Sequence, residues 1–131
     1  MKQAAAGTGH LGPPRAHRAA VTSALLDAIR TQARSFFRDA RGSHDWDHTE
    51  RVLRLSLRIG KKERADLDVL RLAALLHDIG RGREDRSNGK VCHGKAGAAL
   101  AGAILRGYGL DPHLVSDVVH CVRTHRFRKR A

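Results

Sequence analysis

The sequence predicts an all-α domain of about five helices, and three observations support this prediction. Apolar residues recur at spacings of three and four over several long stretches, which is the period of an amphipathic helix. Alternation typical of strands is nearly absent, and the pair Asn88-Gly89 lies in a polar stretch rather than between β-rich runs. The 131 residues suffice for one domain, whose core must be mainly aliphatic because aromatic residues make up only 4% of the chain.

The chain begins with residues that are small, polar and interrupted by prolines. We expect residues 1–17 to form a flexible leader and residues 18–131 to form the folded domain. The first helix is expected over about residues 19–40, because Gly42 and Ser43 follow it as stop signals. Its inward face comprises Leu25, Leu26, Ile29, Phe36 and Phe37.

The next two helices are expected to be separated by a short turn. Asp47 is a good N-cap for a second helix that reaches about Arg64, and Asp66 precedes a third. The third is expected to end at Ile79-Gly80, since glycine suits a C-terminal cap. Residues 81–90 are rich in glycine and charge, which predicts a loop.

Two further helices complete the prediction. The fourth is expected over about residues 93–107. The fifth begins at Asp111-Pro112, a cap followed by proline at the first helical position, and continues to about residue 126.

Composition restricts the location and the partners of the chain. The sequence has no run of eighteen apolar residues and no signal peptide. Without a secretory signal, Cys92 and Cys121 are expected to be reduced thiols. We therefore expect a cytoplasmic protein without a membrane partner. The net charge of +12 permits a nucleic-acid partner. That partner is not favoured, because the basic residues are spread along the chain and only the end, "RTHRFRKRA", is dense.

Histidines accompany the apolar stripes of four predicted helices. Each stripe repeats at helical spacing. The stripes are His48, Val52, Leu55 and Ile59; Leu67, Leu70, Ala74 and His77; His93, Gly97, Leu100 and Ile104; and Leu114, Val118, Cys121 and His125. Asp78 lies beside the second stripe, whereas His120 lies off the fourth, nearer Asp117 and Thr124.

This joint pattern favours a metal site. A single histidine on such a stripe is ordinarily a core residue with a hydrogen bond. Burying several imidazoles and a carboxylate together is unfavourable unless something pairs with them, and a divalent metal does so. Mixed nitrogen and oxygen ligands suit manganese, iron, cobalt or zinc. Because neighbours on a helix diverge by about 100°, His77 and Asp78 can share a metal only near a helix end, or they straddle two metals.

Four segments of the chain resemble the HD-domain superfamily of metal-dependent phosphohydrolases, most of all its small stand-alone bacterial and archaeal hydrolases. They read "HDWDHTERVLRLSLRIG", "LAALLHDIGRG", "HGKAGAALAGAIL" and "VVHCVRTHRF", and the resemblance covers about residues 43–127. It implies a helical bundle packed orthogonally around a metal site. It also implies hydrolysis of a phosphate ester or phosphoanhydride, with a nucleotide as the first substrate to consider.

The resemblance also implies site residues. The metal ligands would be His48, His77 and Asp78, the last two being catalytic as well, and His93 and His120 would complete a second site. The cofactor would be one or two divalent ions, with manganese, magnesium, cobalt, nickel, iron and zinc not distinguished.

Substrate-binding candidates surround these ligands. Arg81, Arg83 and Lys95 are basic groups near the expected mouth of the site. His44 and His125 match histidines of the local family pattern, and Asp45 beside His44 would position His48 or contact substrate.

One departure from the family pattern bears on these expectations. The family's last metal-binding Asp follows the "HRF" segment, whereas the last acidic residue here is Asp117. We expect C-terminal truncation, which would leave an apolar face that favours a homodimer. Otherwise His120, His93, water or another chain replaces that ligand.

Two other functions stay open at this point. Some HD-type proteins with a two-iron site are oxygenases, and His93 and His120 are compatible with one. The chain could also be a catalytically impaired helical module that binds nucleotides or nucleic acid.

Overall fold

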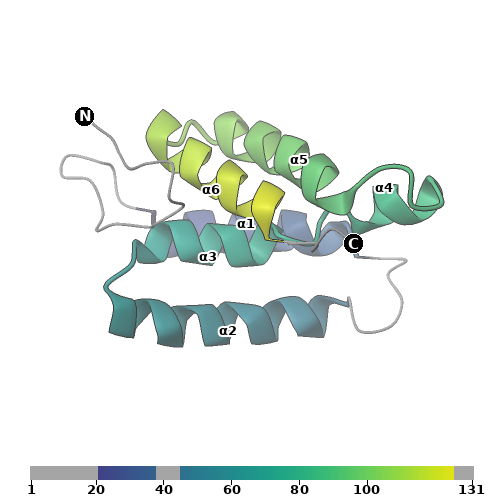
Figure 1. Ribbon diagram of the computed structural model, residues 1–131. Coiled ribbons are helices and arrows are strands. Elements are labelled where there is room, and N and C mark those ends of the chain that lie inside the picture. The colour runs from purple at the N-terminus through teal and green to yellow at the C-terminus, as the bar shows by residue number, and fades with distance from the viewer. Residues whose placement is uncertain (1–20, 38–44, 126–131) are drawn as a thin grey trace.

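A computed structural model describes residues 21–37 and 45–125. These residues form six α-helices and no strand, which confirms the all-α prediction (Figure 1). The helices are α1 (Ser23–Ser35), α2 (Trp46–Glu63), α3 (Leu67–Leu76), α4 (Arg81–Arg86), α5 (His93–Gly107) and α6 (Pro112–Thr124). The expected leader, residues 1–17, lies outside the described residues.

Side-chain caps begin four of the helices. Thr22, Asp66 and Asp111 accept hydrogen bonds from backbone N–H groups in the first turns of α1, α3 and α6. The prediction for α2 was wrong by two residues, because Asp45 and not Asp47 is the cap. Asp45 has extended backbone angles that aim its carboxylate at the N–H of His48, 3.0 Å away, whereas Asp47 already lies in the first turn.

The end of the third helix also differs from the prediction. Helix α3 ends at Leu76, and the expected loop after it contains the short helix α4. Gly80 has a φ of −82°, so it is not a left-handed cap. Glycine is needed there because a Cβ would overlap the carbonyl oxygen of His93 and crowd the backbone nitrogen of Gly97 in α5. Close approach of the two backbones therefore explains Gly80.

Helix α3 forms the centre of the core. Residues 72–76 are all buried, and α3 contacts α1, α2 and α6, while α5 packs along α6. The largest fully buried aliphatic side chains come from α1, α3, α5 and α6 and are Ile29, Leu72, Leu75, Leu76, Leu105 and Leu114. The core is therefore aliphatic, as the composition predicts.

The predicted inward stripe of the second helix was wrong over much of its length. Leu55 and Ile59 are 57% and 52% exposed, whereas Thr49, Leu53 and Gly60 are buried. Gly60 explains the difference, because a Cβ there would overlap the Leu70 side chain of α3. Helix α2 therefore packs against α3 through the side that carries Gly60.

Four chain segments meet at one end of the bundle. Helices α2 and α5 begin there, and α3 and α6 end there (Figure 1). Within the described residues, no helix is both long enough and apolar enough to cross a membrane. Residues far apart in the sequence are therefore collected at this end.

Candidate metal centre

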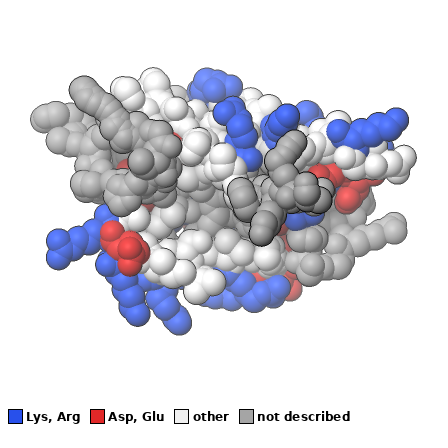
Figure 2. Space-filling view, in the orientation of Figure 1, with Lys and Arg blue, Asp and Glu red and all other residues white. Residues whose placement is uncertain are grey.

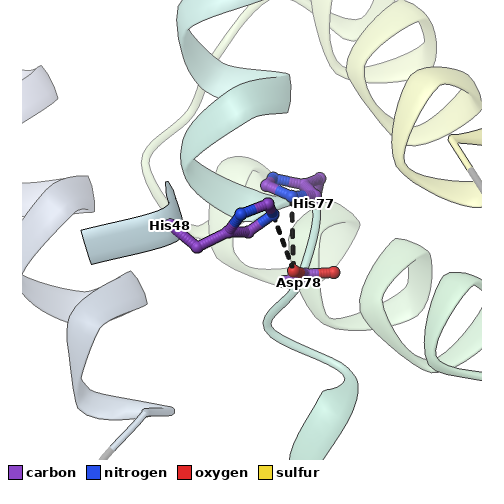
Figure 3. A group of neighbouring side chains, drawn as sticks. All are labelled: His48, His77 and Asp78. Carbon is purple, nitrogen blue, oxygen red and sulfur yellow. Dashed lines mark ion pairs between the residues drawn. The ribbon is translucent and has the colours of Figure 1, made fainter. Parts of the chain in front are cut away.

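Four imidazoles from four segments meet around one carboxylate, that of Asp78. His48 lies in the first turn of α2, His77 and Asp78 follow α3, His93 begins α5, and His125 follows α6. Figure 3 shows the imidazoles of His48 and His77 directed at Asp78.

Asp78 stands at the centre of this cluster. Its Oδ2 lies 3.3 Å from His77 Nε2 and 3.8 Å from His48 Nε2. Its Oδ1 lies 3.5 Å from His125 Nε2 and 3.7 Å from His93 Nε2. The side chain is only 2% exposed. The two carboxylate oxygens thus face two different pairs of imidazoles.

These contacts define two groups that share Asp78. One consists of His48, His77 and Asp78, and the other of Asp78, His93 and His125, with the ligand atoms of each group within 4.8 Å of one another. A shared carboxylate between two imidazole pairs is compatible with one or two divalent cations.

Backbone carbonyls fix the orientation of two of the imidazoles. His77 Nδ1 donates to the carbonyl of Ala74 at 2.7 Å, and His125 Nδ1 donates to that of Val122 at 2.6 Å. A carbonyl only accepts, so the proton of each neutral ring is on Nδ1. The lone pairs on Nε2 are then directed at Asp78, which is the tautomer that binds a metal.

Glu84, a residue of α4, orients a third imidazole, that of His93. Its Oε2 accepts from His93 Nδ1 at 3.2 Å and from the backbone N–H of His93 at 3.0 Å. Glu84 therefore fixes the His93 ring and caps the start of α5. This is the relation that a metal-binding histidine commonly has with a carboxylate.

The arrangement of His93 and His125 supports a cation in the cluster. Their Nε2 atoms lie 3.0 Å apart. Because both Nδ1 atoms donate to acceptors, both Nε2 atoms carry lone pairs in the neutral rings. Two such lone pairs repel each other unless a proton or a metal lies between them or beside them. The donor set therefore fits a divalent metal.

The electrostatics of the metal-free cluster are dominated by Asp78. Burial raises the pKa of its carboxyl. Hydrogen bonds that His125 and His77 donate from Nε2 in their protonated form, together with the charges of His77 and Arg81, outweigh burial and hold that pKa well below its usual range. Burial lowers the pKa of His77, yet the hydrogen bond to Asp78 and its charge outweigh burial, so this pKa is raised. Burial, together with the charge of Arg81, lowers the pKa of His93 despite its bond to Glu84.

The other sequence-predicted site residues have different positions. Arg81 contacts the cluster, with Nε 3.4 Å from Asp78 Oδ1. His120 is exposed and belongs to neither ligand group, and His125 is in the second group instead. Arg83 and Lys95 are exposed, and His44 lies outside the described residues.

Glu84 is the site residue that sequence reasoning missed. It lies nine residues before His93, in a stretch expected to be a loop, so periodicity gives no signal for it. Asp45 was expected to position His48 or touch substrate, and its hydrogen bond to the His48 N–H matches the first of these roles.

The sequence is similar to a protein family and to individual known proteins. The HD domain family model matches residues 45–131. The uncharacterized protein YpgQ of Bacillus subtilis is 45% identical over 53 residues, which are 40% of this chain and 26% of YpgQ. Ribonuclease Y of Borreliella burgdorferi is 34% identical over 73 residues, which are 56% of this chain and 14% of that protein.

A solved structure agrees with the family match. The crystal structure of a predicted HD superfamily hydrolase from an uncultured Thermotogales bacterium has a TM-score of 0.71 and 36% sequence identity, over 76% of this chain and 57% of that chain. The chain thus spans little more than half of this relative and about a quarter of YpgQ. Because the family model covers most of the sequence and the fold agrees, the chain belongs to the HD domain family.

Proposed function

We propose that this chain is a metal-dependent phosphohydrolase that acts on a phosphate ester or phosphoanhydride. The observation that carries the proposal is the convergence of four imidazoles on the two oxygens of Asp78. Membership of the HD domain family and the likeness to an HD superfamily hydrolase support it. The proposed ligands of one or two divalent cations are His48, His77, Asp78, His93 and His125.

The chain's own residues would prepare such a site in three ways. Asp78 supplies the negative charge and presents one oxygen to each imidazole pair. The Nδ1 hydrogen bonds hold the Nε2 lone pairs toward the centre, and Arg81 steadies Asp78 Oδ1 and Glu84. A divalent metal held there supplies Lewis acidity, which polarises a phosphoryl oxygen and lowers the pKa of water.

A nucleotide is the first substrate that we propose. Arg81, Arg83 and Lys95 are the cationic side chains near the cluster in the sequence, and arginine suits phosphate oxygens. The similarity to ribonuclease Y supports a second candidate, a phosphodiester of RNA. Hydrolysis of either substrate would break a P–O bond.

The deciding experiment measures phosphate, pyrophosphate and nucleotide release from a panel of nucleotides and a short RNA. The chain is supplied in turn with manganese, magnesium, cobalt, nickel, zinc or ferrous iron. His77→Ala, Asp78→Ala and His125→Ala should each abolish the release. His113→Ala, an exposed histidine on α6, is the matched control and should retain it.

Two outcomes would overturn the proposal. One is equal activity, or equal inactivity, of the unaltered chain and the Asp78→Ala variant with every metal. The other is oxygen consumption by the iron-loaded chain without any phosphate release, which would favour the di-iron oxygenase instead.

A further inference from the structure

Helix α2 carries a row of positive side chains away from its buried side. The row comprises Arg51, Arg54, Arg58, Lys61 and Lys62, all of them exposed. At about 100° per residue the five fall within a sector about 100° wide, away from Thr49, Leu53 and Gly60. In Figure 2, lysine and arginine side chains gather along the lower edge of the molecule, where α2 lies in Figure 1.

The row begins next to the candidate metal centre. His48 lies one helical turn before Arg51 and points at Asp78 (Figure 3). From Arg51 to Lys62 the row extends about 17 Å along the axis at about 1.5 Å per residue. A ligand that lies along α2 therefore reaches the metal cluster at one end.

Apolar side chains border this row on the same edge as His48. Leu55 and Ile59 are 57% and 52% exposed and lie about one and two turns beyond Arg51. The face thus offers cations in a line and aliphatic carbons beside them. Such a face matches a chain of phosphates that carries apolar or aromatic groups on one side.

The charges of this row are not neutralised within the described part of the chain. Arg30, Arg71 and Arg81 pair with acidic residues, but no ion pair joins any member of the α2 row to a described carboxylate. The acidic residues of α2 are Asp47 in its first turn, Glu50, which pairs with Arg30, and Glu63 at its end. Like charges four residues apart, as in Arg54 with Arg58 and Arg58 with Lys62, destabilise a helix. An anionic partner would remove this repulsion.

We propose that the α2 face, meaning the five cations with Leu55 and Ile59, binds the backbone of a single nucleic-acid strand and leads it to the metal cluster. This inference rests on the proposed function, which it deepens by naming the substrate class. A second copy of the chain fits this face poorly because the same positive row would meet itself. A strand suits it, since phosphates recur every few ångströms along a nucleic acid and release counterions when lysine and arginine bind them.

The test measures strand binding without catalysis. Fluorescence anisotropy of labelled 20-residue oligo(U) and oligo(dT) is recorded in EDTA over a range of salt concentrations. The Arg51→Gln/Arg58→Gln/Lys62→Gln variant is compared with Arg34→Gln/Lys90→Gln/Arg106→Gln, which removes the same charge from exposed positions elsewhere. Circular dichroism checks that both variants remain folded.

Loss of three phosphate contacts should reduce the slope of log K against log[salt] by about 2, at about 0.7 per contact for a single strand. The control should retain most of the slope. Equal losses in both variants would overturn the proposal, because net charge alone would then explain binding. Binding to poly-glutamate or to phosphatidylglycerol vesicles with no binding to either strand would also overturn it.

The test of strand binding and the test of the proposed function can each fail while the other succeeds. Strand binding is measured without metal, whereas hydrolysis is measured with metal, on nucleotides as well as on a short RNA, and depends on His77 and Asp78. Hydrolysis without strand binding would contradict only the role of the α2 face. Binding without hydrolysis of any substrate would contradict the phosphohydrolase instead.

Discussion

At the scale of single residues, the cluster is ordered mainly by what its histidines do with Nδ1. Ala74 and Val122 supply carbonyls and Glu84 supplies a carboxylate, so three rings are held with Nε2 toward Asp78. Position and tautomer are therefore set before any ligand arrives. Preorganisation of this kind strengthens metal binding, because fewer groups must be ordered at the moment of binding.

Glu84 gives the sharpest test of this reasoning. Glu84→Ala should weaken divalent metal binding about tenfold to a hundredfold, because the His93 ring loses the partner that orients it. Glu84→Gln should lose less, since its amide oxygen still accepts from Nδ1. Isothermal titration calorimetry with manganese or zinc measures both. Equal affinity of Glu84→Ala and the unaltered chain would contradict the positioning role, and His113→Ala serves as the control.

The titration of His77 and His93 predicts how the stability of the metal-free chain depends on pH. The raised pKa of His77 gives stability that is present below about pH 6.5 and lost as the pH rises through the folded pKa. The lowered pKa of His93 gives stability that is present above about pH 6.5 and lost as the pH falls through its folded pKa. Their combined contribution is therefore largest near pH 6.5.

Urea unfolding in EDTA at pH 5.5, 6.5 and 8.0 measures this dependence. The urea midpoint should be highest near pH 6.5. His77→Gln should remove the decline of the midpoint between pH 6.5 and 8.0 and leave its decline between pH 6.5 and 5.5 unchanged. A midpoint that rises steadily to pH 8.0 in the unaltered chain would contradict the predicted sign for His77.

At the scale of the elements, the sequence predicts the helices better than their faces. Periodicity and capping residues place five helices within a few residues, because both are local properties. The stripe of α2 was misjudged because Gly60, which gives no hydrophobic signal, is the residue that permits contact with α3. Likewise, α4 was expected to be a loop, since its six residues carry no apolar repeat.

Gly80 shows how close packing between elements serves the metal cluster. Gly80→Ala should destabilise the fold by about 1–3 kcal/mol, because the new methyl group meets backbone atoms of α5 that cannot move independently. It should also weaken metal binding by displacing His93. Gly107→Ala is the matched control, since a Cβ there meets nothing within 4 Å, and it should be neutral or stabilise by up to about 1 kcal/mol.

Urea unfolding followed by circular dichroism and a metal titration check this pair of variants. A Gly80→Ala variant as stable as the control would show that the α3–α5 approach is not constrained by Gly80.

At the scale of the whole molecule, the candidate centre exists only when four segments are packed together. The order of its histidines along the chain could be predicted from helical stripes that each carry an imidazole at one end. The stripe of the last helix contains His125 and leaves out His120, whereas the family resemblance pointed to His120. The packing of α6 against α3 and α5 brings His125 to Asp78. The contact of Glu84 with His93 likewise depends on how α4 folds back against α5.

This dependence predicts that metal binding stabilises the entire domain. A cation held by His48, Asp78, His93 and His125 would tie together the adjoining ends of α2, α3, α5 and α6, and the unfolded chain lacks that arrangement. A ligand that binds only the folded state adds about 2.7 kcal/mol at a hundred times its Kd. The urea midpoint should therefore rise with added manganese or zinc and return to its starting value with EDTA.

Asp78→Ala isolates the source of that stabilisation. The variant removes the carboxylate common to both ligand groups, so its urea midpoint should no longer respond to metal, whatever its own stability. Lys90→Ala, at an exposed position after α4, should respond as the unaltered chain does. An equal metal-dependent shift in Asp78→Ala would mean that the cation binds elsewhere, and the four helix ends would then be held together by packing alone.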